Sequence, residues 1–164
     1  MGARRRQREG PTGVLEPRGL QEQGLVSVDT PGLNAIGTEP ELTLSLLPSA
    51  HAVLFVLAAD TGVTKTDLEV WNDHLAGTDT ATRAGRLVIL NKIDGLWDGI
   101  RSEAEIETEI ARQMDATAGI LELDANHIYP VSAQKGLLAK INRDDGLLAK
   151  SRLPTLEHAL TTEL

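Results

Sequence analysis

Three short polar segments, each directly after an apolar run, contain side chains that could bind a nucleotide. The first is Asp29-Thr30-Pro31-Gly32. An aspartate at the end of a strand can hold Mg2+ through water, because this ion keeps much of its hydration shell. Gly32 has no Cβ, so its backbone N–H could approach a phosphate oxygen. The same residues also fit an ordinary Pro-Gly turn, and both interpretations stay open.

The second segment, Asn91-Lys92-Ile93-Asp94, carries an acceptor suited to guanine. A carboxylate only accepts hydrogen bonds, and the Watson–Crick edge of guanine offers two adjacent N–H donors that adenine lacks. Asp94 could therefore bind both donors at once. Asn91 would brace the loop by hydrogen bonds, and the stem of Lys92 would lie along the base plane. The alternative is a charged surface loop before the next element.

The third segment is Ser132-Ala133-Gln134-Lys135, followed by Gly136. The small side chains of Ser132 and Ala133 would let backbone N–H groups face an oxygen of a base, which suits the carbonyl group of guanine. Alone, this sequence is also common where a helix starts. The three segments in this order are more specific than any one of them.

The apolar pattern predicts an α/β fold that positions these segments. Near-continuous apolar runs predict four buried parallel strands, at Leu25–Val28, Ala52–Leu57, Arg86–Leu90 and Ile128–Val131. Helical patterns lie at Glu41–Leu47, Lys65–Leu75, from Glu103 to about Ala118, and after Pro154. Ser102 followed by Glu105 predicts a capping box. Ligands of such folds bind beyond the carboxyl ends of the strands, where the polar segments stand.

The three segments together resemble motifs of the GTPase superfamily of P-loop proteins. DTPG, NKID and SAQK stand as its third, fourth and fifth motifs, with 62 positions from Asp29 to Asn91 and 38 from Asp94 to Ser132. The stretch from Asp29 to Pro48, continued from Ala58 to Asp67, further resembles the bacterial dynamin-like family. The similarity covers residues 20–164. It implies an α/β fold, namely an incomplete parallel-sheet P-loop GTPase (G domain) with three α/β/α layers.

The resemblance implies GTP or GDP and Mg2+ as ligands, and GTP hydrolysis coupled to membrane remodelling as the activity of a full-length parent. The implied nucleotide-binding residues are Asp29, Gly32, Asn91, Lys92, Asp94, Ser132, Ala133 and Gln134, with Asp29 also at the metal. A dimer of G domains and a peripheral membrane association of the parent are further expectations. Asp60 and Lys65, in the loop after the second strand, are candidate dimer contacts or else belong to a solvated loop.

Two motifs of the superfamily are not found in the sequence. A P-loop reads GxxxxGK(S/T), but no lysine follows a glycine; the five are Lys65, Lys92, Lys135, Lys140 and Lys150. The switch threonine is also unidentified, since residues 1–23 contain only Thr12. Phosphoryl transfer depends on positioning and neutralising the phosphates. No catalytic residue is therefore assigned, and we expect that this chain alone does not hydrolyse GTP.

The chain is expected to have two parts. Residues 1–19 form a disordered or non-native basic tail, and residues 20–164 correspond to the C-terminal part of a dynamin-type G domain lacking the P-loop. A fragment or a misannotated gene would explain this pattern. In the resembling fold, the strand before the P-loop lies between those corresponding to Leu25–Val28 and Ala52–Leu57. Its omission would leave two apolar edges unpaired.

Net charge and amino-acid composition limit which partners the protein is expected to bind and where in the cell it is expected to be. Residues 1–18 carry a net charge of +3 and residues 19–164 of −11. Such an acidic body repels phosphate backbones, so no nucleic acid is expected as a partner. The chain has no cysteine, and its longest apolar run, Ala52 to Ala59, is too short to span a membrane. A cytoplasmic protein is expected. The four histidines lack metal-ligand spacing, and Trp71 is expected in the core.

Two other functions stay open. One is a non-catalytic remnant that acts as an interaction module by pairing with an intact GTPase. The other is a GTPase of ribosome assembly, a class that also uses DTPG and NKxD, although the acidic body offers no basic RNA-binding extension. Saturable binding of a GTP analogue would separate a nucleotide-binding protein from a remnant.

Overall fold

The computed structural model describes residue 50, residues 52–76 and residues 85–162 of the chain. Several predictions for residues 1–49 lie outside this part. They are the basic tail, the strand Leu25–Val28, the site residues Asp29 and Gly32, and the helix Glu41–Leu47. The structure therefore bears on the second and third polar segments but not on the first.

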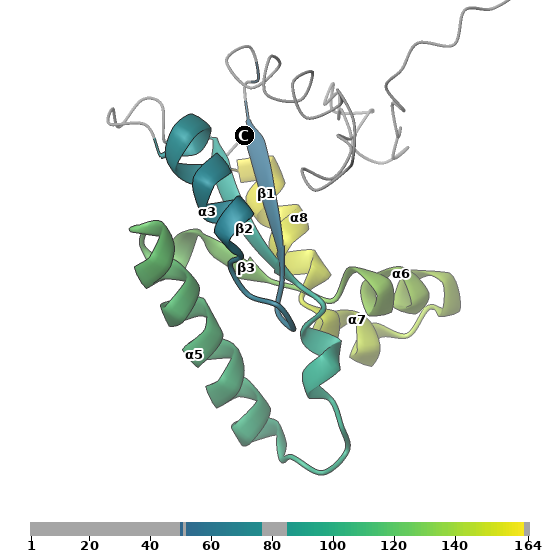
Figure 1. The fold of residues 1–164 in the computed structure, drawn as a ribbon. Coiled ribbons are helices and arrows are strands. Elements are labelled where there is room, and N and C mark those ends of the chain that lie inside the picture. The colour runs from purple at the N-terminus through teal and green to yellow at the C-terminus, as the bar shows by residue number, and fades with distance from the viewer. Residues whose placement is uncertain (1–49, 51, 77–84, 163–164) are drawn as a thin grey trace, which may run out of the picture. The chain divides into compact units, whose positions relative to one another are not determined.

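Three parallel strands form a sheet in the order β1-β2-β3 (Figure 1). Their bounds are Val53–Ala58 for β1, Arg86–Asn91 for β2 and Ile128–Pro130 for β3. Each bound lies within one residue of an expected strand, so these predictions are confirmed. The register places Leu90 of β2 opposite Leu57 and Pro130. The four apolar residues of β2 are all buried, as expected of a middle strand covered on both faces.

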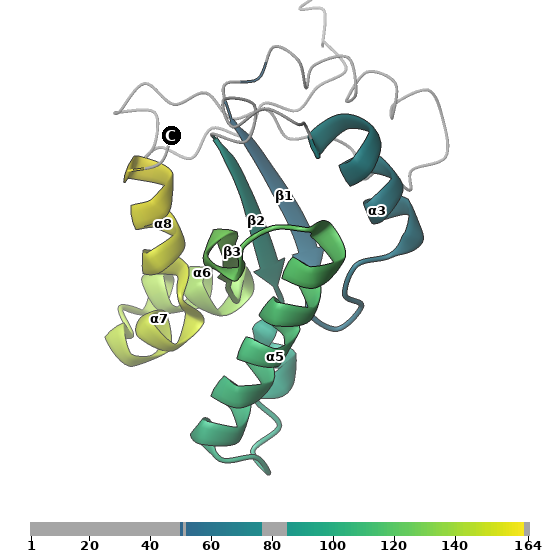
Figure 2. The same cartoon turned by 90° about the vertical axis from the view of Figure 1, so that its left-hand side faces the viewer.

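One face of the sheet is covered by α5 and by a helix that changes type along its length (Figure 2). This helix was expected at Lys65–Leu75 and consists of α3, Lys65–Val70, followed by the π-helical turn η2, Trp71–Leu75. α5 spans Glu103–Leu121. Trp71 is buried in this core as predicted, and its indole N–H donates to the carbonyl of Leu121 at 3.0 Å. The indole nitrogen is therefore satisfied despite its burial.

The opposite face is covered over β2 and β3 by α8, Leu153–Thr162, which completes three α/β/α layers (Figure 2). Leu156 of α8 packs against Ile89 of β2, which confirms the apolar helix face predicted after Pro154. On this same face, Leu54 and Val56 of β1 are 41% and 57% exposed. α8 therefore protects the middle of the sheet but not its β1 side.

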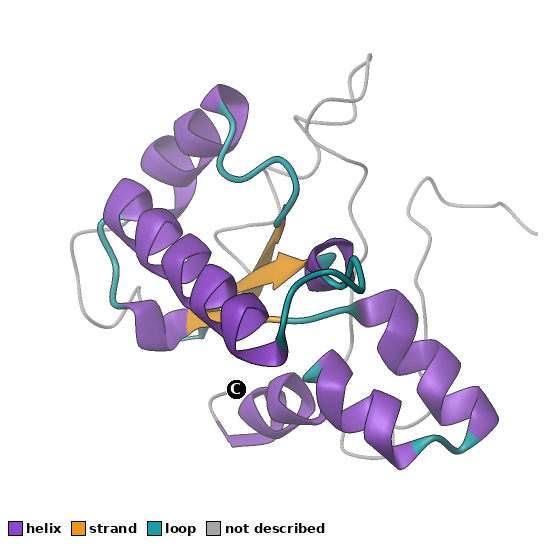
Figure 3. Cartoon of the chain, turned by 90° about the horizontal axis from the view of Figure 1, so that it is seen from below, coloured by secondary structure: helices purple, strands orange, loops and turns teal. Residues whose placement is uncertain are grey.

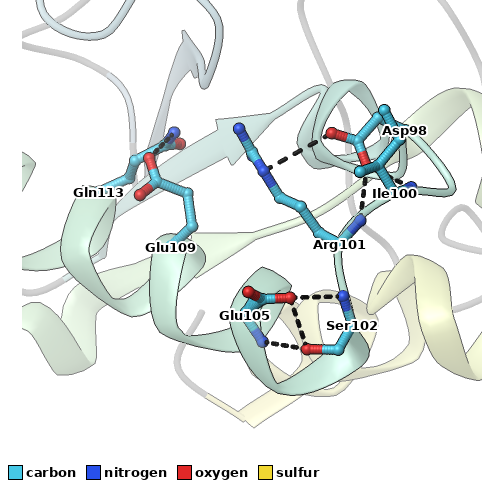
Figure 4. A network of polar contacts seen from close by, with 7 residues as sticks. All are labelled: Asp98, Ile100, Arg101, Ser102, Glu105, Glu109 and Gln113. Atoms are coloured by element: carbon cyan, nitrogen blue, oxygen red, sulfur yellow. Dashed lines mark hydrogen bonds and ion pairs between the residues drawn. The ribbon is translucent and has the colours of Figure 1, made fainter.

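Local hydrogen bonds fix the start of α5, as the sequence predicts (Figure 4). The Ser102 hydroxyl accepts from the N–H of Glu105 at 3.3 Å, and the Glu105 carboxylate accepts from the N–H of Ser102 at 2.7 Å. The preceding turn closes when Asp98 accepts from the N–H groups of Ile100 and Arg101 at 2.9 and 3.0 Å. These backbone donors lower the pKa values of Glu105 and Asp98.

Two short helices follow β3 that the apolar pattern does not predict (Figure 3). α6 spans Ala133–Asn142 and α7 spans Asp145–Ser151. Each begins after a capping residue, Ser132 or Asp144, whose side chain accepts the N–H three residues on. Each ends at an arginine in the left-handed conformation, with φ of 55° and 59°. α6 was missed because its large apolar residues do not face the core.

Two kinds of feature are not found within the described ranges. No helix there combines the length and apolar character needed to cross a bilayer. The same residues contain no group of three or more histidine, aspartate or glutamate side chains placed to hold a metal ion. His74, His127 and His158 lie among the described residues, and His51 lies outside them.

Candidate functional site

The second and third polar segments meet at the carboxyl edge of the sheet, where parallel strands end together. Asn91 is the last residue of β2, and Ser132 follows β3 by two residues. The Ser132 hydroxyl donates to Oδ1 of Asp94 at 2.6 Å, although these residues are 38 positions apart. The N–H of Ile93 also donates to the carbonyl of Val131 at 3.3 Å. These hydrogen bonds join the two loops.

Asn91 braces both loops with one side-chain oxygen. Its Oδ1 accepts from the N–H of Lys92 at 2.8 Å and from the N–H of Ala133 at 3.1 Å. Lys92 has φ 67° and ψ 30°, a left-handed conformation that is uncommon outside glycine. This turn brings the N–H of Lys92 back onto the Asn91 side chain. The structure therefore places Asn91 at the junction of β2 with both loops.

The loop after β1 contributes a third polar side chain to this edge. Nζ of Lys92 lies 3.5 Å from Oδ2 of Asp60, and the two side chains are 61% and 58% exposed. Such an exposed pair contributes little to stability. The pKa of Asp60 is lowered, mostly by the hydrogen bond from the Thr61 hydroxyl and less by Lys92. Lys65, the other expected dimer contact, pairs with Glu69 within α3 at 3.6 Å, and its role in a dimer stays a prediction.

Ser132 is fully buried, and its backbone and hydroxyl are both bonded. Its N–H donates to the carbonyl of Ser151 at 2.9 Å, and its Oγ accepts from the N–H of Lys135 at 3.3 Å. Ser151 is also fully buried, and its hydroxyl donates to the carbonyl of Leu148 at 2.6 Å. Sequence reasoning missed Ser151 because it missed α7. The capping residue Asp144 was the available signal.

The backbone donors of the third segment are arranged differently from the expectation. Ser132 and Ala133 were expected to offer their N–H groups to a base oxygen, but both already have acceptors, in Ser151 and Asn91. A base oxygen at Ala133 would therefore share that donor or displace the amide oxygen. Gln134 is exposed in the first turn of α6, and its N–H has no acceptor among the described residues. Gln134 is thus the more accessible donor.

Asp94 keeps accepting capacity at the centre of this site. It is half-buried in the 3-10 turn η3, Ile93–Leu96. The Ser132 hydroxyl occupies one lone pair of Oδ1, while Oδ2 has no donor among the residues that the structure describes. A carboxylate oriented by a buried hydroxyl, with an oxygen still available, can bind two adjacent N–H donors of a ligand. Among the described residues, the carboxyl edge of the sheet therefore carries the Asp94 carboxylate as an acceptor and the N–H groups of Ala133 and Gln134 as donors.

Comparison with solved structures identifies the fold. The chain is similar to Era in complex with MgGDPNP and part of 16S ribosomal RNA, with a TM-score of 0.53 and 20% identity over 85% of this chain and 39% of that one. Era from Aquifex aeolicus bound to GDP·AlF4 gives a TM-score of 0.53 and 19% identity over 85% and 40%. The chain has a P-loop GTPase fold. The predicted fold class of the G domain is therefore confirmed.

Of two relatives found by sequence comparison, one carries the name of a GTPase. No protein-family model matches the chain. The "uncharacterized protein in xynA 3'region" of Caldicellulosiruptor sp. (strain Rt8B.4) is 24% identical over 145 residues, 88% of this chain and 34% of that protein. The "probable transmembrane GTPase FZO-like, chloroplastic" of Arabidopsis thaliana is 30% identical over 122 residues, 70% of this chain and 12% of that protein. The chain thus spans a small part of each relative.

Proposed function

We propose that this G-domain chain recognises the guanine base of GTP or GDP at the carboxyl ends of β2 and β3. The observation that carries the proposal is the 2.6 Å hydrogen bond by which Ser132 holds Asp94. Asp94 would accept the ring N–H and the exocyclic amino group of guanine, and the N–H groups of Gln134 and Ala133 would donate to its carbonyl oxygen. Adenine offers neither the donor pair nor that oxygen.

Binding of the phosphates is outside the part of the site that the structure describes. Asp29 would hold Mg2+, which would neutralise phosphate charge, and Gly32 would approach a phosphate oxygen. The sequence contains no GxxxxGK(S/T) motif to cradle the phosphates. Binding costs about 4 to 15 kcal/mol in lost freedom of motion, so base contacts alone give weak affinity. We therefore propose base recognition without GTP turnover by this chain.

Within the superfamily, we propose that the chain is related to dynamin-like GTPases, whose parent activity is GTP hydrolysis coupled to membrane remodelling. The residues from Asp29 to Asp67 support this, as does the 30% identity to the FZO-like transmembrane GTPase. A cytoplasmic location, peripheral membrane association of the parent and a dimer of G domains belong to the same proposal. Asp60 is the candidate dimer residue that lies beside the base loop.

A ribosome-assembly GTPase is the second candidate. It is favoured by the structural likeness to Era, one of whose structures contains 16S ribosomal RNA. RNA is then a competing partner, against the expectation of no nucleic acid that rests on the net charge of −11 over residues 19–164. Filter binding of a 16S RNA fragment at two salt concentrations separates the candidates. Salt-dependent RNA binding would favour ribosome assembly, and a dynamin-like chain should show none.

An NMR titration of the full 164-residue chain tests base recognition even at weak affinity. GDP at millimolar concentration should shift the amide signals of Asn91–Asp94 and Ser132–Gln134, while ADP should not. Asp94→Ala should weaken GDP binding about tenfold or more, since a hydrogen bond to a charged group contributes about 1.5 to 3 kcal/mol. Asp73→Asn removes an exposed carboxylate on η2 and serves as the control. Equal shifts with GDP and ADP would contradict the proposal.

A further inference from the structure

α6 has its large apolar side chains directed to solvent. Leu137, Leu138 and Ile141 are 61%, 42% and 70% exposed, whereas the buried residues of this helix are Gly136 and Ala139. A surface helix normally has the reverse arrangement, with its large apolar residues toward the core. Single exposed apolar residues are ordinary, but three on adjacent positions of one helix face form a patch. The α6 patch is defined as these three residues.

The close approach of α8 explains why the inner side of α6 is small. A Cβ added to Gly136 would lie 2.7 Å from Cδ2 of Leu153 and 3.0 Å from Oγ of Ser151. No larger side chain fits at this position. The α6 patch faces the other way, so its large side chains cannot be buried at this contact with the chain's own C-terminal helices. Only a surface brought to the outer side of α6 can bury them.

Basic residues border the α6 patch. Residues 133–143 contain Lys135, Lys140 and Arg143 and no acidic residue, within an otherwise acidic body. Lys140 pairs with Glu157 of α8, but neither Lys135 nor Arg143 has an ion-pair partner among the described residues. On a helical wheel Lys135 and Lys140 fall on opposite sides of the patch. The patch is therefore apolar in the middle and positive at its border.

We propose that the α6 patch binds an amphipathic helix whose apolar stripe is flanked by aspartate or glutamate. Leu137 and Ile141 are four residues apart and form one ridge, and Gln134 and Leu138 form the next. The groove between two such ridges accepts a ridge of a second helix. Acidic flanks on that helix would meet Lys135 on one side of the patch and, in competition with Glu157, Lys140 on the other. The three residues of the α6 patch take no part in the proposed guanine recognition, although Gln134 of the neighbouring ridge offers its backbone N–H there.

Two other occupants fit the same patch less well. In a symmetric dimer through α6, the basic border of one copy would meet the basic border of the other, which is repulsive. An anionic bilayer would attract Lys135 and Lys140, but its extended charged surface would also face the acidic body, which has a net charge of −11 over residues 19–164. A single helix covers little more than the patch, and charges farther away are screened by salt. An acidic helix satisfies both the apolar centre and the positive border without either conflict.

Fluorescence anisotropy with designed peptides tests this proposal on the full chain. The probe is a helical peptide of about 20 residues, a length at which isolated helices form in water, with a leucine stripe flanked by glutamate. We expect this peptide to bind, while a version with lysine in place of glutamate and a scrambled acidic version bind at least about tenfold more weakly. Equal binding of the acidic and basic versions, or no binding of the acidic one, would overturn the proposal.

Matched variants locate the binding to the α6 patch. The double change of Leu137→Ser and Ile141→Ser should weaken the acidic peptide at least about tenfold, with the circular dichroism spectrum and unfolding midpoint retained because both residues are exposed. Ile100→Ser, at an apolar residue 89% exposed outside the patch, should bind as the unchanged chain does. Unchanged peptide binding by the double variant would refute the assignment.

The two alternative partners of the α6 patch, a second copy of the chain and an anionic membrane, would give distinct results. Sedimentation velocity that showed self-association abolished by the Leu137→Ser and Ile141→Ser pair would assign the patch to a second copy. Binding to vesicles of phosphatidylcholine and phosphatidylserine, lost in the same variant, would assign it to a membrane. Either result would replace the acidic helix as the partner. The expected result is a monomer that ignores vesicles and binds the acidic peptide.

Discussion

The buried hydroxyl of Ser132 lies 2.6 Å from Oδ1 of Asp94 and couples the loops that follow β2 and β3. The same oxygen of Ser132 accepts the N–H of Lys135, so one side chain both starts α6 and orients the carboxylate. Mutation can separate the helix-capping role of Ser132 from its contact with Asp94. The chain offers a comparison in Ser102, which caps α5.

Ser132→Ala should lower the free energy of unfolding by about 2 to 3 kcal/mol, because it removes a helix cap and a hydrogen bond to a carboxylate. Ser102→Ala removes the exposed cap of α5 together with an exposed hydrogen bond to the Glu105 carboxylate, and should cost about 1 kcal/mol because both contacts are open to water. Urea denaturation followed by circular dichroism measures both. If the two variants lost the same stability, the partly buried contact with Asp94 would contribute no more to folding than the exposed contact of Ser102 with Glu105.

Replacement of Asn91 distinguishes its acceptor role from a need for its amide group. Asn91→Ala leaves the N–H groups of Lys92 and Ala133 without their acceptor, and should cost about 1 to 3 kcal/mol of stability. Asn91→Asp retains the oxygen and should cost clearly less. Thermal unfolding measures the difference. An aspartate variant as unstable as the alanine variant would show that the amide nitrogen matters as well.

Glu109 should titrate far below an ordinary glutamate. The Arg112 guanidinium binds its two carboxylate oxygens at 2.8 and 2.6 Å, and Gln113 adds a third hydrogen bond, which lowers its pKa to about 2. Arg112→Gln should raise this pKa toward the ordinary value, as a carboxyl-carbon NMR titration would show. Because the pKa of Glu109 is lower in the folded state than in the unfolded state, the ion pair with Arg112 stabilises the fold fully above about pH 4.5. This stabilisation is lost as the pH falls through about 2. An unchanged titration in the variant would contradict the contact.

Two glycine-to-alanine changes in helices should have opposite signs. Gly136→Ala places a Cβ 2.7 Å from Cδ2 of Leu153, and should destabilise by about 1 to 3 kcal/mol despite its better helix propensity. Gly119→Ala in α5 meets nothing within 4 Å, and should stabilise by about 0.5 to 1 kcal/mol. Chemical denaturation of both variants gives the comparison. Stabilisation by Gly136→Ala would mean that α6 and α8 separate easily.

Sequence patterns predicted the described sheet because β1, β2 and β3 are near-continuous apolar runs, and such runs have few alternatives in an α/β chain. The cap at Ser102 was predicted because its partner Glu105 is three residues away. α6 and α7 were not predicted, since their inner contacts depend on Gly136, Ala139 and Ser151, which give no apolar periodicity.

The candidate site was predicted as a set of residues but not as a network. Asn91, Asp94, Ser132 and Ala133 do come together, because parallel strands end at one edge. Which N–H group meets which oxygen depends on the left-handed turn at Lys92 and on Ser151, which lies in a helix the pattern did not show. The placement of Asp29 and Gly32 stays a prediction.

The hydrogen bond from the N–H of Ser132 to the carbonyl of Ser151 has a mechanical consequence. Ser151 is separated from α8 by one residue, so α8 is connected to the loop after β3 by a short link. A force that pulled α8 along its axis would reach Asp94 through two successive bonds. A displacement of α8 would therefore shift the carboxylate that we propose as the acceptor for the base.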